Sequence, residues 1–83
     1  MKKEWYVYLL ECQDGSYYTG VTIDVDVRMK AHVEGKGSKY VYQKGFKELL
    51  KVKLCEDKSD ACKCEYEIKQ LPRNMKLGWF DFS

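Results

Sequence analysis

The chain lacks the long apolar run of a membrane helix: nothing in its 83 residues approaches the roughly 20 apolar residues that such a helix needs. The two N-terminal lysines are followed by Glu4 and aromatic residues, without an apolar segment or a small-residue cleavage site. We therefore expect no signal peptide, no membrane partner and a cytoplasmic location. Repeats and low-complexity tracts are also absent, and the length predicts a single domain over residues 1–83.

Cysteine occurs only four times, at Cys12, Cys55, Cys62 and Cys64. In a reducing compartment these are expected as free thiols. Cys62 and Cys64 form a close pair that invites a zinc interpretation, but the usual gap of two to four residues is missing, and there is no second pair. We therefore favour free thiols over a zinc site.

Neither sign of charge dominates: 15 basic and 13 acidic residues give a net charge of only +2. The distribution is uneven, because residues 28–53 carry +6 and the remainder carries −4. The basic stretch includes Tyr40, Tyr42 and Phe46, and lysine can neutralise phosphate while aromatic rings stack on bases. Charge alone favours a polyanion-binding segment and a solvated lysine-rich loop about equally.

Three strands are predicted from apolar alternation and aromatic content, at residues 4–12, 16–21 and 47–56. Asp14-Gly15 separates the first two and is a strong hairpin signal. A two-residue turn there would pair Gln13 with Ser16.

Two helices are predicted from caps and breakers. The first is expected after a cap at Thr22 or Asp24 and ends at Gly35, and the second lies between a cap at Ser59 and Pro72.

The remaining segments are expected to be largely irregular. Residues 35–46 predict a mobile loop because of their glycines, and residues 73–83 predict a helical turn with an aromatic tail. The resulting order ββαβα indicates an α+β fold, a small three-stranded antiparallel sheet flanked by helices.

Glu65 departs from the pattern of the second helix. Four residues have the spacing of a buried stripe: Ala61, Cys64, Ile68 and Leu71. Glu65 falls on or beside this stripe, and a carboxylate directed at a core must be paired, protonated or bound to a metal. Taken alone, a rim glutamate paired with a lysine or arginine is the simpler interpretation.

Arg28 and His32 share one face of the first helix, because they are four residues apart. A guanidinium suits phosphate, and histidine exchanges protons near neutral pH, although a lone histidine is more often structural. Together with Glu65 as a cation ligand and tyrosine hydroxyls near an attacking water, they describe phosphodiester hydrolysis with a single metal ion. Clustered acids for a second ion are lacking.

These features lie in five short motifs in the order of the GIY-YIG nuclease superfamily, which the chain resembles from Trp5 to about Lys76. The motifs are Tyr6-Val7-Tyr8, Tyr18-Thr19-Gly20, "GVTIDVDVRMKAH", "EGKGSKY" and "EDKSDACKCEYEIKQL". The similarity is greatest to the small stand-alone bacterial proteins of the YhbQ-like type. Each motif is weak, but five in order are specific. The resemblance implies the GIY-YIG fold.

The resemblance also implies roles for individual residues. Tyr8 and Tyr18 would orient or deprotonate the water, Arg28 would stabilise the phosphate, and His32 would assist proton transfer or phosphate binding. Glu65 would bind one Mg²⁺ or Mn²⁺ ion. Four residues of the basic loop would bind nucleic acid: Lys36, Lys39, Tyr40 and Lys44. The motif residues Tyr6, Val7, Thr19 and Gly20 would be structural, with Tyr6 and Thr19 replacing the family's glycine and isoleucine.

The implied activity is metal-dependent endonucleolytic hydrolysis of DNA, in branched, damaged or single-stranded form, during DNA repair or recombination. Because no DNA-binding domain is appended, we expect a protein partner to supply specificity. The alternatives are a catalytically weak nucleic-acid-binding module and a protein-interaction module on the same fold. If Tyr8 and Tyr18 share a site, the hairpin loop must have three or five residues, or contain a bulge, so that Tyr8 lies near Gly20.

Overall fold

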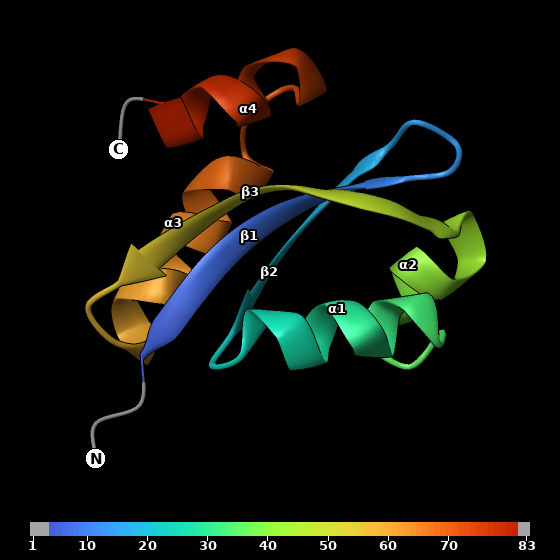
Figure 1. Cartoon of the computed structure of the whole chain (residues 1–83). Coiled ribbons are helices and arrows are strands. Elements are labelled where there is room, and N and C mark those ends of the chain that lie inside the picture. Colours follow the sequence, from blue (N-terminus) through green and yellow to red (C-terminus); the bar gives the residue numbers. More distant parts are fainter. Residues whose placement is uncertain (1–3, 82–83) are drawn as a thin grey trace.

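The structure, a computed structural model, describes residues 4–81 and contains a three-stranded antiparallel sheet with flanking helices (Figure 1). Its elements are β1 (Trp5–Cys12), β2 (Tyr17–Thr22), α1 (Val25–Val33), α2 (Lys39–Lys44), β3 (Phe46–Cys55), α3 (Lys58–Lys69) and α4 (Arg73–Asp81). The predicted α+β class and sheet are confirmed, but the order is ββααβαα. Within residues 4–81, no helix is long and apolar enough to cross a membrane.

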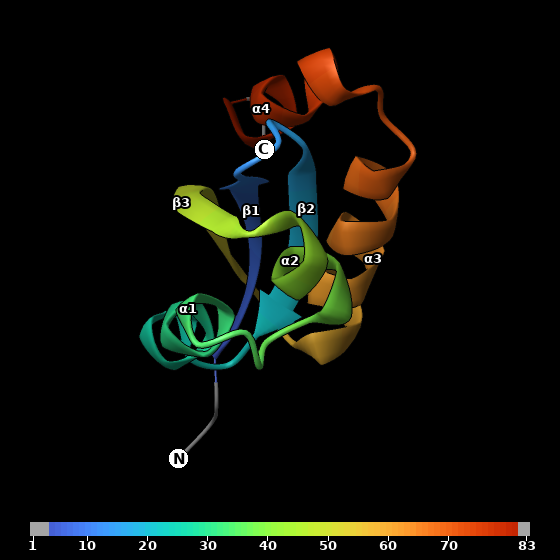
Figure 2. The ribbon, with the colours of Figure 1, turned by 90° about the vertical axis from the view of Figure 1, so that its right-hand side faces the viewer.

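β1 is the central strand, in the order β2-β1-β3, and it is buried on both faces. Figure 2 shows α3 on one side of the sheet and α1 on the other. Val7 and Leu9 pack into the core beneath α3. Tyr8 and Leu10 point the other way, into a second core that includes Val41 of α2. Helices on both faces explain why the strand is an almost continuous apolar run.

Short polar side chains begin the helices. Asp24 caps α1 by accepting a hydrogen bond from the Val27 backbone N at 3.1 Å. Asp57 caps α3 by accepting one from the Asp60 backbone N at 2.8 Å, so the prediction of Ser59 as the cap was wrong. Asp57 has the extended backbone that a cap requires, and α3 has already begun when the chain reaches Ser59.

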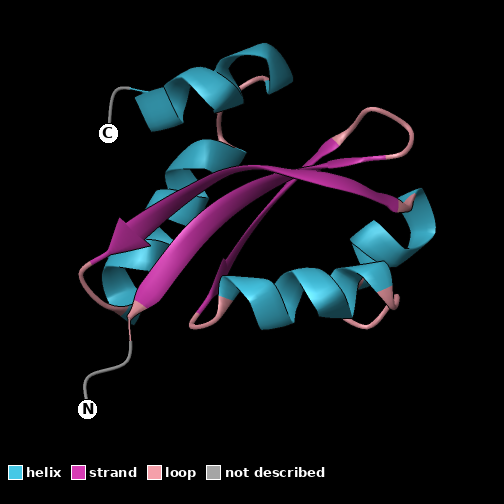
Figure 3. Cartoon of the chain, viewed as in Figure 1, coloured by secondary structure: helices cyan, strands magenta, loops and turns pink. Residues whose placement is uncertain are grey.

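Helix α2 replaces part of the loop expected at residues 35–46 (Figure 3). Ser38 caps it by accepting a hydrogen bond from the Tyr40 backbone N at 3.2 Å, and Gly45 ends it at a φ of +83°. Six residues are less than two turns, so the helix leaves almost no apolar period in the sequence.

Helix α4 is longer than the single turn expected at residues 73–83. Leu77, Trp79 and Phe80 pack against the core beneath α3, so this part of the predicted aromatic tail is packed. Residues 82–83 of the predicted tail lie outside the described residues.

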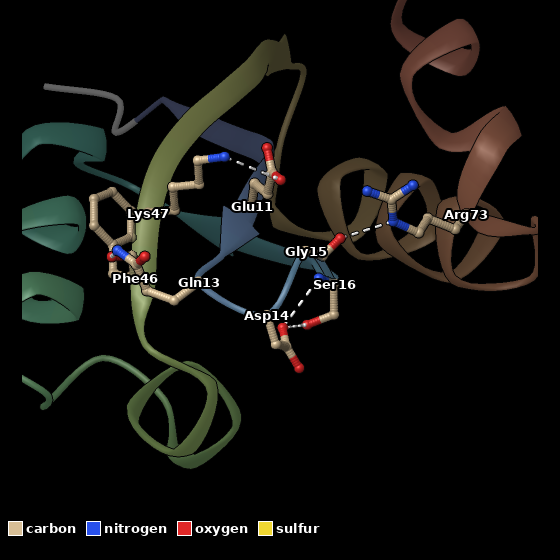
Figure 4. Close-up of polar contacts among 8 residues, drawn as sticks. All are labelled: Glu11, Gln13, Asp14, Gly15, Ser16, Phe46, Lys47 and Arg73. Atoms are coloured by element: carbon tan, nitrogen blue, oxygen red, sulfur yellow. Dashed lines mark hydrogen bonds and ion pairs between the residues drawn. The ribbon is translucent and has the colours of Figure 1, made fainter.

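The β1–β2 hairpin closes through a three-residue loop, so the two-residue turn was wrong. Cys12 N donates to Ser16 O at 2.8 Å, and Gly15 N donates to Cys12 O at 2.9 Å. Gly15 has a φ of +86°, the left-handed conformation of a type I turn that ends in a bulge. Figure 4 shows Asp14 holding Ser16, and Arg73 of α4 donating to the Gly15 carbonyl at 2.8 Å. Helix α4 therefore fixes the turn that sets the register.

Candidate active site

The three-residue loop places Tyr8 opposite Gly20 and Leu10 opposite Tyr18. Because residues on one strand alternate between faces, Tyr8 and Tyr18 therefore lie on the same face of the sheet. Their ring centroids are 6.3 Å apart. The two sequence-predicted tyrosines meet on the side that α1 and α2 cover.

His32 projects from α1 onto these two rings. Its Nε2 shares a hydrogen bond of 2.9 Å with the Tyr8 hydroxyl, and both side chains are buried. The His32 ring also meets Tyr18 edge to face, with centroids 5.7 Å apart. The Phe46 ring lies parallel to the imidazole, with ring centroids 6.4 Å apart. These contacts hold the imidazole in one orientation.

Two glycines make room for the paired side chains. A Cβ at Gly20 would collide with the Tyr8 hydroxyl, so the absence of a side chain at Gly20 makes room for the Tyr8 ring. A Cβ at Gly37 would lie 2.5 Å from His32 Nδ1. That nitrogen is buried and has no hydrogen-bond partner among the described residues. The backbone at Gly37 thus closes over the far side of the imidazole.

Burial keeps both members of the pair neutral. It raises the pKa of Tyr8 far above the ordinary value of 10.0; the charges of Tyr18 and Glu65 add to the rise, and Arg28 opposes it. Burial lowers the pKa of His32 from its ordinary value of 6.5, and the Arg28 guanidinium lowers it further. At neutral pH the Tyr8 hydroxyl therefore keeps its proton, and the neutral imidazole can accept one.

Arg28 and Glu65 lie on helices that cover opposite faces of the sheet. Arg28 is half-buried on α1, whereas Glu65 is carried by α3, which packs on β1 and the edge strand β2 from the opposite side. The charges of both side chains act on Tyr8. The Glu65 carboxylate is 25% exposed and lies 3.6 Å from Lys69 Nζ. The lysine pairing considered for Glu65 from the sequence is therefore present, but it is an exposed pair.

The stripe on α3 that makes Glu65 stand out lies where it was expected. Ala61, Cys64 and Ile68 are buried, while Leu71 is half-buried beyond the end of the helix. Glu65 borders this stripe and is less exposed than its neighbours Tyr66 and Glu67. Within residues 4–81, Glu65 belongs to no group of three histidine, cysteine or carboxylate side chains that could hold a metal ion.

The predicted nucleic-acid contacts lie on α2 and the turn before it. Lys36 and Lys39 are exposed, and the structure places no acidic partner within ion-pair distance of either among the described residues. Tyr40 stacks on Tyr18, with ring centroids 5.8 Å apart, and is 40% exposed. Lys44 instead pairs with Asp14 at 3.4 Å.

The other motif residues lie in the sheet, on β1 and β2. Val7 and Thr19 are buried, and Thr19 lies opposite Leu9 in the β1–β2 ladder. Tyr6 is half-buried, and its hydroxyl donates to Glu4 at 2.7 Å. Its side chain is on the same face as that of Tyr8, two residues further along β1.

Phe46 is a site residue whose position the sequence did not reveal. It was grouped with aromatic residues that could stack on bases, but its ring lies against His32. Gly37 was one of the glycines from which a mobile loop was predicted at residues 35–46, and its backbone lies against His32. A glycine in a loop can indicate a close approach, but it does not show which side chain lies against it.

Comparison with known proteins gives close matches. Residues 4–77 match the family model of the GIY-YIG catalytic domain. UPF0213 protein BH0048 from Halalkalibacterium halodurans is 49% identical over 71 residues, which are 86% of this chain and 76% of that protein. UPF0213 protein OB0043 from Oceanobacillus iheyensis is 46% identical over 82 residues, 99% of this chain and 95% of that protein.

A solved structure agrees. The solution NMR structure of UPF0213 protein BH0048 from Bacillus halodurans has a TM-score of 0.58 and 44% identity, and the match covers 96% of this chain and 85% of that one. The family model and the relatives together confirm the resemblance that the five motifs indicated. The chain belongs to the GIY-YIG catalytic domain family and, within it, to the UPF0213 proteins.

Proposed function

We propose that this protein is a divalent-metal-dependent endonuclease that hydrolyses phosphodiester bonds in branched, damaged or single-stranded DNA. Family membership implies nuclease-type activity on nucleic acid; the metal, the form of DNA and a role in repair or recombination are the proposed part. The observation that carries the proposal is the buried hydrogen bond between Tyr8 and His32, within the field of Arg28 and Glu65. A cytoplasmic location follows from the same proposal.

The Tyr8–His32 pair accepts the proton of the attacking water. Tyr8 alone is a poor base at neutral pH, because burial raises its pKa and its hydroxyl therefore stays protonated. Neutral His32 can take the Tyr8 proton through Nε2, at 2.9 Å, while the Tyr8 oxygen takes a proton from water. This route requires the His32 tautomer that carries its hydrogen on Nδ1. His32 thereby becomes an imidazolium, and the water becomes a nucleophile.

Arg28 and Glu65 would act on the phosphate from two sides. The Arg28 fork would bind the non-bridging oxygens, where negative charge develops. The Glu65 carboxylate suits Mg²⁺ or Mn²⁺, because it is a hard, partly exposed ligand whose pairing with Lys69 at 3.6 Å is weak. When bound, such an ion supplies positive charge at the phosphoryl oxygens. A single carboxylate leaves the other positions to water and substrate.

The DNA strand would lie along α2, next to the tyrosines. Lys36 and Lys39 offer exposed positive charge, and Tyr40 presents a ring already stacked on Tyr18. Lysine contacts to phosphate carry no sequence information, so this surface favours DNA structure over DNA sequence. A protein partner would then supply any target specificity.

A cleavage assay with parallel binding measurements tests the proposal. Purified protein is incubated with single-stranded, duplex and branched DNA in Mg²⁺, in Mn²⁺ and in chelator. We expect cleavage only with metal, and we expect Glu65→Ala to abolish cleavage while binding to DNA at low salt persists.

Two outcomes would contradict the endonuclease proposal in different ways. Binding of all three DNAs without cleavage in either metal leaves the catalytically weak binding module. No DNA binding at low salt removes both nucleic-acid functions and leaves the protein-interaction module. Lys63→Ala is the matched surface control, since Lys63 is exposed on α3 and outside the basic stretch.

A further inference from the structure

A second group of metal-ligating side chains lies where β3 ends and α3 begins. The sulfurs of Cys55 and Cys64 and a carboxylate oxygen of Asp60 all lie within 4.8 Å of one another. Cys55 and Cys64 are 6% and 7% exposed, and Asp60 is half-buried. The site already described uses none of these three residues.

The local fold brings the three ligands together. Asp60 and Cys64 are four residues apart on α3 and therefore share one face of the helix. Cys55 is the last residue of β3, and a short loop returns the chain to α3 (Figure 3). The Glu56 backbone N donates to Asp60 Oδ2 at 3.0 Å, which fixes that carboxylate and leaves Oδ1 for a ligand.

We propose that Cys55, Asp60 and Cys64 bind one Zn²⁺ ion, with water as the fourth ligand. Zinc accepts thiolate sulfur at about 2.3 Å and carboxylate oxygen at about 2.0–2.2 Å in a tetrahedron, where ligand atoms are about 3.3–3.8 Å apart. The three ligand atoms lie within 4.8 Å of one another, so no separation exceeds that range by more than about 1–1.5 Å. Two sulfur ligands favour zinc over magnesium or calcium, which take oxygen ligands.

The proposed ligands are not the close cysteine pair that was considered from the sequence. Cys62 and Cys64 are neighbours in sequence, but Cys62 is exposed and two residues from Cys64 on the helix, on a different face. Cys64 finds its partner on β3 instead. The ligand spacing along the chain is therefore Cys-x₄-Asp-x₃-Cys, which matches no common zinc motif and explains why spacing alone argued against zinc.

Electrostatics make the cluster repel negative charge and accept a cation. Burial raises the pKa of both thiols, that of Cys55 to about 11, and the Asp60 carboxylate adds to both increases. A Zn²⁺ ion would reverse these repulsions by displacing two thiol protons.

A Zn²⁺ ion bound here would link the end of β3 to α3, the helix that carries Glu65. Cys55 and Cys64 belong to the core beneath α3, so a shared ion would join β3 to α3 one residue before Glu65. The expected role is structural, and it is measurable whether or not the protein cleaves DNA.

Cobalt substitution tests the site in the full chain. Protein reduced with a phosphine is titrated with Co²⁺ at neutral pH and then with Zn²⁺. We expect near-ultraviolet absorption from sulfur-to-cobalt charge transfer and visible bands typical of a tetrahedral site. Both should reach saturation at one Co²⁺ per chain, and Zn²⁺ should displace both. Absence of these bands from the wild-type protein would overturn the proposal.

Three variants identify the ligands. Cys64→Ser should lose about half or more of the charge-transfer absorption. Asp60→Asn, which can still accept the Glu56 hydrogen bond, should lower Co²⁺ affinity at least 10-fold. Cys62→Ser is the matched control and should titrate like the wild type. Loss of the bands in Cys62→Ser, or bands of wild-type intensity in Cys64→Ser, would refute the assignment. Far-ultraviolet circular dichroism checks that each variant is folded, and Asp60→Asn remains informative if Cys64→Ser is not.

Discussion

At the scale of single residues, Tyr8 and Tyr18 contribute differently although they share a site. The Tyr8 hydroxyl is buried and bonded to His32, whereas Tyr18 is half-buried with no hydrogen bond to its hydroxyl among the described residues. Tyr8→Phe should lower the free energy of unfolding by about 1–3 kcal/mol, because both His32 nitrogens are then unpaired. Tyr18→Phe should change it by less than about 0.5 kcal/mol. Urea unfolding measures both; equal losses would contradict the assignment.

The pH dependence of stability follows from His32. Its pKa is lowered in the folded protein, so the unfolded chain takes up a proton first as the pH falls below 6.5. This contribution to stability is fully present above pH 6.5 and is lost as the pH falls towards the folded-state pKa, at no more than about 1.4 kcal/mol per pH unit. His32→Gln should show a flatter profile between pH 6.5 and 5 in urea unfolding. Parallel profiles would show that His32 does not titrate as described.

Gly37 tests the space around the imidazole. Gly37→Ala places a methyl group 2.5 Å from His32 Nδ1, so His32 or the loop must shift, and both stability and any cleavage rate should fall. Gly78→Ala is the matched control, because Gly78 lies within α4 with open space where a Cβ would be added. That change should be neutral or stabilise by up to about 1 kcal/mol. If the two variants unfold alike, the close approach at Gly37 is not significant.

At the scale of elements, the position of the α3 cap can be measured directly. Asp57→Ala should lower the free energy of unfolding by about 0.5–2 kcal/mol, because the hydrogen bond to the Asp60 backbone N is lost. Ser59→Ala should change it by less than about 0.5 kcal/mol, since Ser59 is exposed inside the first turn. Thermal unfolding followed by far-ultraviolet circular dichroism distinguishes the two. A larger loss in Ser59→Ala would restore it as the cap.

The elements that the sequence predicted are those with a long pattern or strong boundary residues. β1, β2 and β3 lie within one residue of the expected bounds, and Asp24, one of the two expected caps, caps α1. α2 was missed because six residues carry no apolar period, although Ser38 and Gly45 mark its ends. The hairpin loop was predicted two residues long because Asp14-Gly15 fits both turn types. Only the requirement that Tyr8 and Tyr18 share a face favoured the longer loop.

The candidate site was predictable as a set of residues but not as an arrangement. Motif order named the tyrosines, Arg28, His32 and Glu65. Sequence could not reveal that Arg28 and Glu65 lie on helices that cover opposite faces of the sheet, or that Phe46 stacks on His32, because both arrangements involve segments far apart in the chain. The roles of these residues stay predictions.

At the scale of the whole molecule, the basic stretch is less positive than its +6 charge indicates. Lys44, Lys47 and Lys51 pair with Asp14, Glu11 and Asp81 respectively, which come from outside the stretch. Five basic residues of the stretch make no ion pair within residues 4–81: Arg28 and Lys30 on α1, Lys36 and Lys39 before and at the start of α2, and Lys53 on β3.

Salt dependence of DNA binding measures this distribution. Lys36→Ala and Lys39→Ala should each reduce the slope of log affinity against log salt by up to about 1, because each removes one phosphate contact. Lys44→Ala should have a smaller effect because Asp14 already offsets its charge. Lys63→Ala should have none. Equal slopes for wild type, Lys36→Ala and Lys39→Ala would place the DNA on another surface.

The central claim is that Glu65 and the Tyr8–His32 pair carry out one hydrolytic reaction. Its most direct test is the single-turnover cleavage rate on branched DNA in Mn²⁺, measured for the wild type, Glu65→Gln and Tyr8→Phe with binding matched. We predict cleavage by the wild type and at least a 100-fold slower rate for each variant, as expected for loss of a catalytic group. Cleavage by either variant at the wild-type rate, or none by the wild type in any metal, would contradict the account.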